Sequence, residues 1–328
     1  MNNVQQDIDE RSNLTSLNKL ELLLFRLGGD GSGNHSELYG INVFKIREIV
    51  AMPHVTPIAE SHPFMMGVVN LRDQIIPVID LPGIIGCVPS GPLKLLLITE
   101  FARTTQAFAV EAVEEIVRLE WTSVLPGDRT AAGAMITSIA KVDGDVPDTR
   151  LAQVLDVESI LRQLHSNEEP AIEANSLGAP ITLPPGQVIL AADDSVVARA
   201  LIENALKEMG AEYVMTNSGK QAWDKLQEID AEAKKEGKSA RDKVALVLSD
   251  LEMPEMDGFT LTRNIKQDGR FSSIPVIIHS SLSGAANENH VNGVGADAYI
   301  AKFVPVELAA LLRKTLAQGA STTGRKPF

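Results

Sequence analysis

The sequence Val244-Ala-Leu-Val-Leu-Ser-Asp250 indicates the fold of the second half of this chain. It is followed by Leu251-Glu-Met-Pro-Glu-Met-Asp-Gly258. A short apolar run ends at one carboxylate and then breaks into a loop that contains Pro254 and Gly258. A buried parallel strand delivers a reactive side chain to the edge of its sheet in this way. We therefore interpret Asp250 as a phosphorylated aspartate and compare the rest of the chain with that interpretation.

Strands and helices are predicted to alternate on both sides of this stretch, from residue 187 to residue 318. The third strand covers residues 244–248, and short apolar segments predict four others at 188–192, 213–215, 275–279 and 298–301. Apolar residues at helical spacing predict helices at 195–209, 219–229 and 306–317, and the charged insertion at 230–242 predicts a helix extension and a loop. This alternation indicates a parallel sheet covered on both faces, with right-handed crossovers.

Polar side chains follow four of the predicted strands, at the sheet edge where ligands bind in such folds. They are Asp193 and Asp194 after the first strand, Asp250 after the third, Ser280 after the fourth and Lys302 after the fifth. Because clustered carboxylates repel one another, a divalent cation is expected among them. Mg²⁺ prefers hard oxygen ligands and often keeps bound waters. The sequence therefore predicts a Mg²⁺ site.

Each of these residues receives a predicted role in phosphoryl transfer. Asp194 and Asp250 are expected to bind Mg²⁺ directly, and Asp193 through water. The backbone carbonyl of Glu252 is expected to supply another oxygen. Asp250 would attack a phosphoryl group through its free oxygen.

The remaining two side chains would act on the transferred group. Lys302, together with Mg²⁺, would stabilise the three phosphoryl oxygens, whose charge the site must offset. Ser280 would donate a hydrogen bond to one of these oxygens after transfer.

In order and spacing, these residues resemble the receiver domains of two-component response regulators. The motifs that carry the resemblance are Asp193-Asp-Ser195, Ser249-Asp-Leu-Glu-Met-Pro-Glu-Met-Asp-Gly258, Ser280 and Ala296-Asp-Ala-Tyr-Ile-Ala-Lys302. The resemblance implies a flavodoxin-like (CheY-like) α/β fold with a five-stranded parallel sheet and a 4-aspartylphosphate at Asp250. It also assigns Tyr299 as an aromatic switch whose ring follows Ser280 inward after phosphorylation. The alternative for Tyr299 is a half-exposed strand tyrosine.

The chain departs from the receiver pattern at two positions. Phe303 follows Lys302 where the family usually has proline in a cis peptide. A cis bond before a non-proline residue costs roughly 3 kcal/mol, so the residue type favours a trans bond but leaves the isomer open. Glu252, two residues after Asp250, is expected to change the rate of dephosphorylation, with no sign assigned.

An internal repeat marks the first half of the chain. Residues 41–50 align without gaps on residues 108–117, with four identities: Val43 and Val110, Glu48 and Glu115, Ile49 and Ile116, Val50 and Val117. Each copy is followed by a predicted hairpin, at 67–81 and at 136–146, and Asp143-Gly144 is a strong turn pair in the second. Two such copies suggest two small β-barrels side by side. Chance similarity of β-rich segments is the alternative.

Nothing in this half forms a catalytic motif. Residues 20–27 predict a strand, and the glycine-rich residues 28–34 predict a hairpin loop that lacks a phosphate-loop motif. His35, His54 and His62 have no metal-ligand spacing to cysteine or carboxylates. The first half is therefore interpreted as a binding module.

Two of its segments resemble CheW-like chemotaxis coupling domains, namely Phe44-Lys-Ile-Arg-Glu-Ile49 and Val68-Val-Asn-Leu-Arg72 with Ile76-Pro-Val-Ile-Asp-Leu81. The resemblance implies an all-β pair of SH3-like barrels that docks to the histidine kinase CheA and to methyl-accepting chemoreceptors. Asp73 replaces the usual glycine at the hairpin turn, and the hairpin is expected to persist.

The resemblance also nominates three partner-contact residues: Ile46, Glu48 and Arg72. For Ile46 the alternative is a core position. For Arg72 it is a structural ion pair.

The predicted domain order is a CheW-like domain at 1–165, with an N-terminal arm or helix at 1–20, a solvated linker at 166–186, a receiver at 187–318 and a tail at 319–328. A helix at 155–164 ends the first domain. This combination resembles the CheV type of chemotaxis coupling protein. The resemblance implies a scaffold between receptors and CheA that phosphorylation of Asp250 regulates, with adaptation of signalling as its purpose.

Composition supports these expectations. A formal net charge of −13 disfavours nucleic acid and anionic membrane surfaces as partners. The single cysteine, Cys87, excludes an intramolecular disulfide and fits a reducing compartment. The N-terminus lacks a secretory signal, and no apolar run is long enough to insert into a membrane. The expected location is the cytoplasm, at receptor arrays on the inner face of the membrane.

Three other functions are alternatives to the regulated scaffold. In the first, the receiver is a phosphate sink that drains CheA. The second is an aspartate-nucleophile phosphatase, which expects Asp-x-Asp-x-Thr after the first strand, where this chain has Asp193-Asp-Ser195. The third is a DNA-binding regulator, which requires a basic recognition helix that the sequence lacks. The expected chemistry is limited to the receiver's own phosphoryl transfer and dephosphorylation, so the chain is not otherwise an enzyme.

Overall fold

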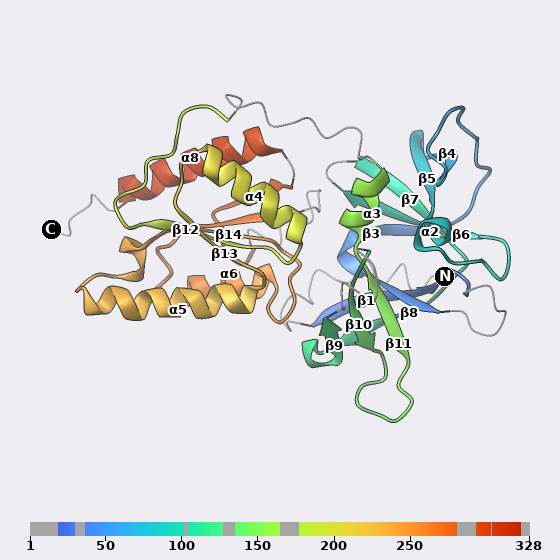
Figure 1. Cartoon of the computed structure of the whole chain (residues 1–328), viewed down its shortest axis with the longest axis horizontal. Coiled ribbons are helices and arrows are strands. Elements are labelled where there is room, and N and C mark those ends of the chain that lie inside the picture. Colours follow the sequence, from blue (N-terminus) through green and yellow to red (C-terminus); the bar gives the residue numbers. More distant parts are fainter. Residues whose placement is uncertain are drawn as a thin grey trace. The chain divides into compact units, whose positions relative to one another are not determined.

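The computed structural model describes residues 19–29, 37–101, 104–126, 135–164, 177–280, 293–302 and 304–322. The chain forms two compact units, Met1–Glu169 and Pro170–Phe328 (Figure 1). The Phe303 peptide lies outside the described residues, so the prediction about its isomer stays open.

Two β-sheets build the first unit. The larger has the order β8-β1-β2-β11-β10-β9, made of β1 (Leu20–Arg26), β2 (Leu38–Asn42), β8 (Ala112–Leu119), β9 (Val124–Pro126), β10 (Ile136–Lys141) and β11 (Leu151–Leu155). The other has the order β3-β6-β7-β5-β4, made of β3 (Ile46–Ala51), β4 (Met65–Leu71), β5 (Gln74–Asp80), β6 (Leu95–Phe101) and β7 (Thr104–Val110). Each sheet contains one parallel pair, β2 with β11 and β5 with β7, among antiparallel neighbours. This architecture confirms the predicted duplicated all-β domain.

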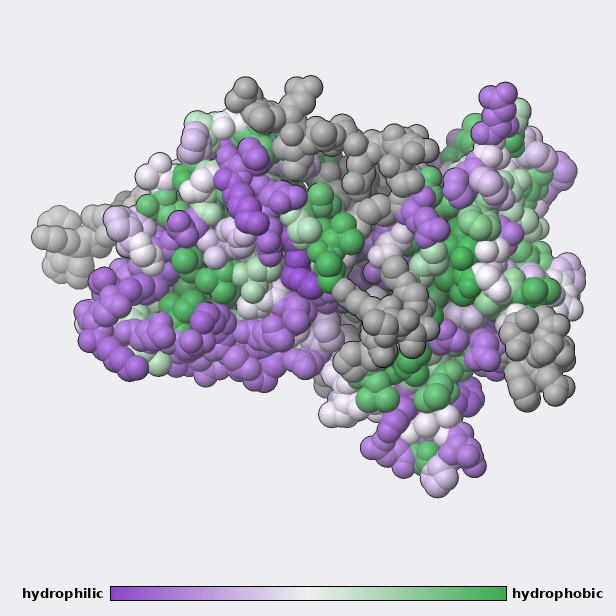
Figure 2. Space-filling view, in the orientation of Figure 1, coloured by the Kyte–Doolittle hydropathy of each residue, from purple (hydrophilic) through white to green (hydrophobic). Residues whose placement is uncertain are grey.

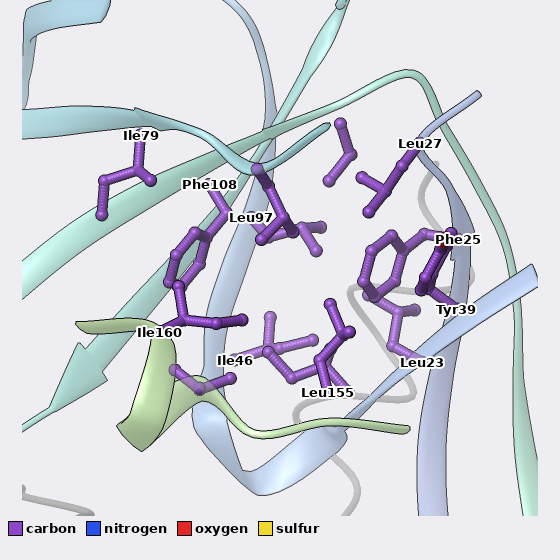
Figure 3. Close-up of a cluster of buried hydrophobic side chains, with 14 of the residues drawn as sticks. Leu23, Phe25, Leu27, Tyr39, Ile46, Ile79, Leu97, Phe108, Leu155 and Ile160 are labelled. Atoms are coloured by element: carbon purple, nitrogen blue, oxygen red, sulfur yellow. The ribbon is translucent and has the colours of Figure 1, made fainter. Parts of the chain in front are cut away.

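Side chains from both sheets and from helix α3 (Val157–Leu164) share one hydrophobic core. Figure 3 shows Phe25, Leu97 and Phe108 from the strands converging with Ile160 from α3. These four side chains are at most 1% exposed. Burying a side chain of this size contributes about 1.5 to 3 kcal/mol, so the shared core holds the two sheets together.

The two predicted hairpins differ in the structure. Arg72 and Asp73 connect β4 to β5, and both have positive φ, at 50° and 64°, as a two-residue hairpin turn requires. The expected persistence of this hairpin without glycine is confirmed. The prediction for the second hairpin is wrong in its turn, because β10 and β11 are joined by the longer loop 142–150.

Asp143 closes that longer loop instead of forming a tight turn with Gly144. Its carboxylate accepts hydrogen bonds from the Arg150 backbone amide, at 3.0 Å, and from Arg150 Nη2, at 2.7 Å. These hydrogen bonds lower the pKa of Asp143 to about 2. The interaction with Arg150 fixes where β11 begins, and no pattern of neighbouring residues reports it.

The second unit is a parallel five-stranded sheet with the order β13-β12-β14-β15-β16. Its strands are β12 (Val188–Ala192), β13 (Tyr213–Thr216), β14 (Val244–Ser249), β15 (Val276–Ser280) and β16 (Ala298–Ala301). Its helices are α4 (Val196–Glu208), α5 (Gly219–Lys235), α6 (Gly258–Gln267) and α8 (Pro305–Thr322). α4 and α8 cover one face and α5 and α6 the other (Figure 1). The predicted flavodoxin-like fold is confirmed.

Two helices on one face of the sheet compare differently with the prediction. α5 continues past residue 229 to Lys235 and is followed by the short helix η4 (Ala240–Asp242), as the charged insertion predicts. Figure 2 shows hydrophilic residues over α5. α6 was not predicted, although Asp257 caps its N-terminus and Leu261 and Ile265 have helical spacing.

Residues 177–183, within the expected solvated linker, pack on the second unit and form a strap. Leu177 and Ile181 are 5% and 7% exposed and belong to the same core cluster as Met209 and Leu312. The Ile181 amide donates to the Met209 carbonyl at 2.7 Å. Their burial shows that this part of the segment belongs to the receiver fold.

Two arginine contacts complete the strap. On α8, Arg313 donates from its guanidinium to the carbonyl oxygens of Leu177 and Ala179.

Among the helices that the structure describes, none is both long and apolar enough to span a bilayer.

Candidate functional site

Three charged side chains meet at the carboxyl edge of the parallel sheet. Asp193 follows β12, Asp250 follows β14 and Lys302 follows β16. Lys302 Nζ lies 2.9 Å from Asp193 Oδ2 and 3.0 Å from Asp250 Oδ2. All three are buried, with side-chain exposures of 1% for the lysine, 0% for Asp193 and 4% for Asp250. Topology thus brings together residues that are far apart in the sequence.

Asp194 adds a third carboxylate. One oxygen from each of Asp193, Asp194 and Asp250 lies within 4.8 Å of the others. Burying charges is unfavourable unless they are compensated, and one ammonium does not balance three carboxylates. Hard carboxylate oxygens in this arrangement fit Mg²⁺, which takes oxygen ligands and keeps waters.

Main-chain hydrogen bonds orient the two buried carboxylates. The Ser195 amide donates to Asp193 Oδ1 at 2.9 Å, and the Leu251 amide donates to Asp250 Oδ1 at 2.7 Å. In both residues Oδ2 is the atom nearest to Lys302. Each carboxylate is therefore held from two sides, which restricts its rotation.

The loop after Asp250 is shaped by Gly258. A Cβ at this position would collide with the carbonyl oxygen of Asp250, and the Gly258 amide donates to the Leu251 carbonyl at 2.8 Å. Asp257 caps α6 by accepting from the Thr260 amide at 2.6 Å, and burial raises the pKa of its carboxyl group. Glycine at residue 258 therefore lets the loop close without this clash.

The predicted switch residues lie on the neighbouring strands. Ser280 ends β15, is 1% exposed and accepts from the Lys302 amide through its carbonyl at 2.8 Å. Tyr299 pairs with Ile278 in the middle of β16 and is half-buried, away from the strand ends that carry the acids. Glu252 is half-buried in the loop after Asp250. Their proposed roles therefore remain predictions.

The sequence analysis did not identify Arg199, whose side chain forms hydrogen bonds with the backbone of the site. From α4 its Nη1 donates to the carbonyl oxygens of both Asp193 and Asp194, at 2.8 Å each. An arginine one helical turn after an acid pair is the only sequence signal for this contact.

The three predicted partner-contact residues of the first unit differ in how far they are buried. Ile46 is 5% exposed and lies in the shared core, as Figure 3 shows, so its position is that of the core alternative. Glu48 and Arg72 form a two-pronged ion pair, with Nη1 to Oε1 at 3.0 Å and Nη2 to Oε2 at 2.8 Å. The Arg72 side chain is 76% exposed. The Glu48 side chain is 13% exposed, so the arginine is the accessible half of this pair.

Comparisons with known proteins match both units. Residues 21–165 match the CheW-like domain family, and residues 189–314 match the response regulator receiver domain family. Chemotaxis protein CheV3 of Helicobacter pylori is 32% identical over 320 residues, which cover 95% of this chain and 99% of the relative. Chemotaxis protein CheV2 of the same organism is 29% identical over 328 residues, with coverage of 95% and 99%. Chemotaxis protein CheY1 of that organism is 33% identical over 130 residues, which cover 39% of this chain and 95% of the relative.

Proposed function

This chain belongs to the CheV family of chemotaxis proteins, with a CheW-like domain and a receiver domain, and we propose that it couples chemoreceptors to the histidine kinase CheA under the control of phosphorylation at Asp250. The observation that carries the proposal is the buried lysine between two carboxylates at the carboxyl edge of the sheet. Such a site suits the transfer of a phosphoryl group to a carboxylate, because the lysine compensates charge on the transferred oxygens.

The proposed reaction transfers a phosphoryl group from a phosphohistidine of the kinase. The phosphorus–nitrogen bond breaks as a bond forms between phosphorus and a carboxylate oxygen of Asp250, and the histidine nitrogen takes up a proton. Asp193, Asp194, Asp250 and the carbonyl of Glu252 would hold Mg²⁺, which supplies positive charge to the phosphoryl oxygens when bound. Lys302 supplies the same compensation from the protein, and the Ser280 hydroxyl is proposed to bind one phosphoryl oxygen.

The CheW-like unit is proposed to be the docking part of the protein. Its folded pair of sheets carries the exposed Arg72 in the β4–β5 turn, where it pairs with the largely covered Glu48 of β3. The proposed location is the cytoplasm at receptor arrays, and neither nucleic acid nor membrane insertion has a part in the function. Phosphorylation of the receiver would then adjust how this unit holds receptors and kinase.

The direct test is phosphotransfer from labelled CheA to the wild-type chain and to Asp250→Asn. Wild type should take up the label, and the variant should lose it because the accepting oxygen is replaced by an amide. A variant that kept the label would show that another residue is the acceptor. Asp257→Asn is the matched control, since it removes a nearby acid that caps α6 and should leave labelling in place.

A second candidate function is a phosphate sink for CheA. The acidic side chain of Glu252, two residues from Asp250, lies where it could alter the access of water to the acyl phosphate. The lifetime of the label distinguishes the two functions. A sink requires fast loss of label and unchanged docking, whereas a regulated scaffold requires docking that changes with phosphorylation.

A further inference from the structure

Arg199 connects the first helix of the receiver to the backbone of both acids that follow β12. Its Nη1 donates to the carbonyls of Asp193 and Asp194, at 2.8 Å each. The side chain is half-buried on α4, which begins at Val196. One guanidinium nitrogen therefore holds two consecutive peptide groups at the point where the strand turns into the helix.

The local hydrogen bonds show why these peptide groups matter. The Ser195 amide donates to Asp193 Oδ1, and the Ser195 hydroxyl accepts from the Ala198 amide at 3.4 Å as the N-cap of α4. A rotation of the peptide between Asp193 and Asp194 would move both the carboxylate of Asp194 and the amide that follows it. The Arg199 contacts oppose such a rotation because both carbonyls share one donor.

We infer that Arg199 is a positioning residue that presets the cation-binding acids Asp193 and Asp194 through their backbone. This inference rests on the proposed phosphoryl-accepting site, since it assigns the residue a part in that site's affinity for Mg²⁺. Arg199 touches neither the cation nor the phosphoryl group in this role. Its contribution is to keep the two carboxylates in the arrangement that binds the ion.

The direction in which the affinity for Mg²⁺ changes distinguishes a positioning role of Arg199 from a purely electrostatic one. Removing a positive charge beside a divalent-cation site strengthens cation binding by itself, because the repulsion between the two cations is lost. Loss of positioning weakens binding, because the acids must be reordered when the ion enters. Arg199→Gln removes the charge and the double contact together, so a weakened affinity can come only from lost positioning.

The chain offers a matched control in Arg241. This arginine is also half-buried, and its Nη1 also donates to two consecutive carbonyls, those of Val244 and Ala245. These residues begin β14, whereas the acids follow the other ends of their strands. Arg241→Gln therefore removes the same kind of contact at the opposite edge of the same sheet.

The experiment is isothermal titration of the full chain with MgCl₂, for wild type, Arg199→Gln, Arg199→Lys and Arg241→Gln. Loss of an outer contact of a metal site lowers affinity by about 10-fold to 100-fold, and we expect the low end for Arg199→Gln. Arg241→Gln should retain the wild-type affinity. Arg199→Lys should fall between, because lysine keeps the charge and one point of contact.

A spectroscopic readout accompanies the titration. The amide resonance of Ser195 in a nitrogen–proton correlation spectrum reports its hydrogen bond to Asp193, and it should shift in Arg199→Gln and stay in place in Arg241→Gln. Equal or tighter Mg²⁺ binding by Arg199→Gln would overturn the inference while leaving the proposed function intact. Absence of Mg²⁺ binding by wild type would overturn both.

Discussion

Two ion-pair clusters in this chain have almost the same distances and different surroundings. In the receiver, Lys302 Nζ lies 2.9 Å and 3.0 Å from the oxygens of Asp193 and Asp250, and its side chain is 1% exposed. In the CheW-like unit, Arg72 Nη2 lies 2.8 Å from Glu48 Oε2, and the side chains are 76% and 13% exposed, so the arginine keeps its hydration. Distance alone therefore says little about what an ion pair does for a protein.

Burial decides the difference. A buried charge loses its hydration, so removing its partner is strongly destabilising, whereas an exposed pair exchanges one hydrated state for another at little cost. The receiver keeps all three charges of its cluster in its interior. The CheW-like unit leaves the guanidinium of its pair in water.

The largest expected effect comes from breaking the buried pair with Lys302→Met. Two buried carboxylates would then face each other without compensation, and we expect the receiver to lose about 3 to 5 kcal/mol of unfolding free energy. Urea unfolding of the full chain, in EDTA so that no divalent cation replaces the lysine, measures this loss.

The double variant Lys302→Met with Asp250→Asn is the control for that loss. It should regain part of the stability, because one of the two uncompensated charges is gone. A loss of less than about 1 kcal/mol in the single variant would mean that the buried pair contributes no more to stability than an exposed pair does.

A smaller effect is expected from Gly258→Ala, which tests the backbone around the buried pair rather than its charges. The new Cβ would meet the Asp250 carbonyl oxygen, so the loop must shift. Overpacking of this kind costs about 1 to 3 kcal/mol, and labelling of Asp250 should slow at the same time. Gly269→Ala is the control, because a Cβ there meets no atom within 4 Å and its φ is not positive. Similar losses in the two variants would contradict the proposed role of the close approach.

The smallest effect on stability is expected from Arg72→Gln, which breaks the exposed pair. The unfolding free energy should change by less than about 1 kcal/mol. Binding to receptor–kinase arrays, measured by co-sedimentation, should nevertheless fall, and Arg47→Gln serves as a control because Arg47 has only a 3.4 Å contact with Gln74. Unchanged co-sedimentation would remove Arg72 from the docking surface, and a large loss of stability would show that the exposed pair is structural.

The sequence predicted best what depends on strand ends. Apolar runs that stop at Asp193, Asp250 and Ser280 can be recognised from the order of the residues alone. A parallel sheet necessarily brings the ends of these runs to one edge. The two acids and Lys302 therefore meet as expected. The internal repeat predicted two small β-barrels in the first unit, where the structure has two β-sheets.

Features that depend on one particular side-chain contact could not be predicted in this way. Arg199 lies in the first turn of α4 and contacts the backbone of the acids just before that helix, and Asp143 closes its loop through Arg150. Ile46 is buried because two sheets share one core, although its strand pattern also fits a surface position. None of these three contacts follows from the periodic patterns that predict strands and helices.

The strap at residues 177–183 has a consequence for how such chains are assembled in evolution. The polypeptide runs beside α8, the last helix of the receiver, before it forms that domain's first strand, and Arg313 fastens the two segments together. Domains whose first and last segments lie side by side can be attached to unrelated neighbours without rearranging their sheets. The strap is therefore part of the receiver, and the receiver can be joined to a docking domain as a single unit.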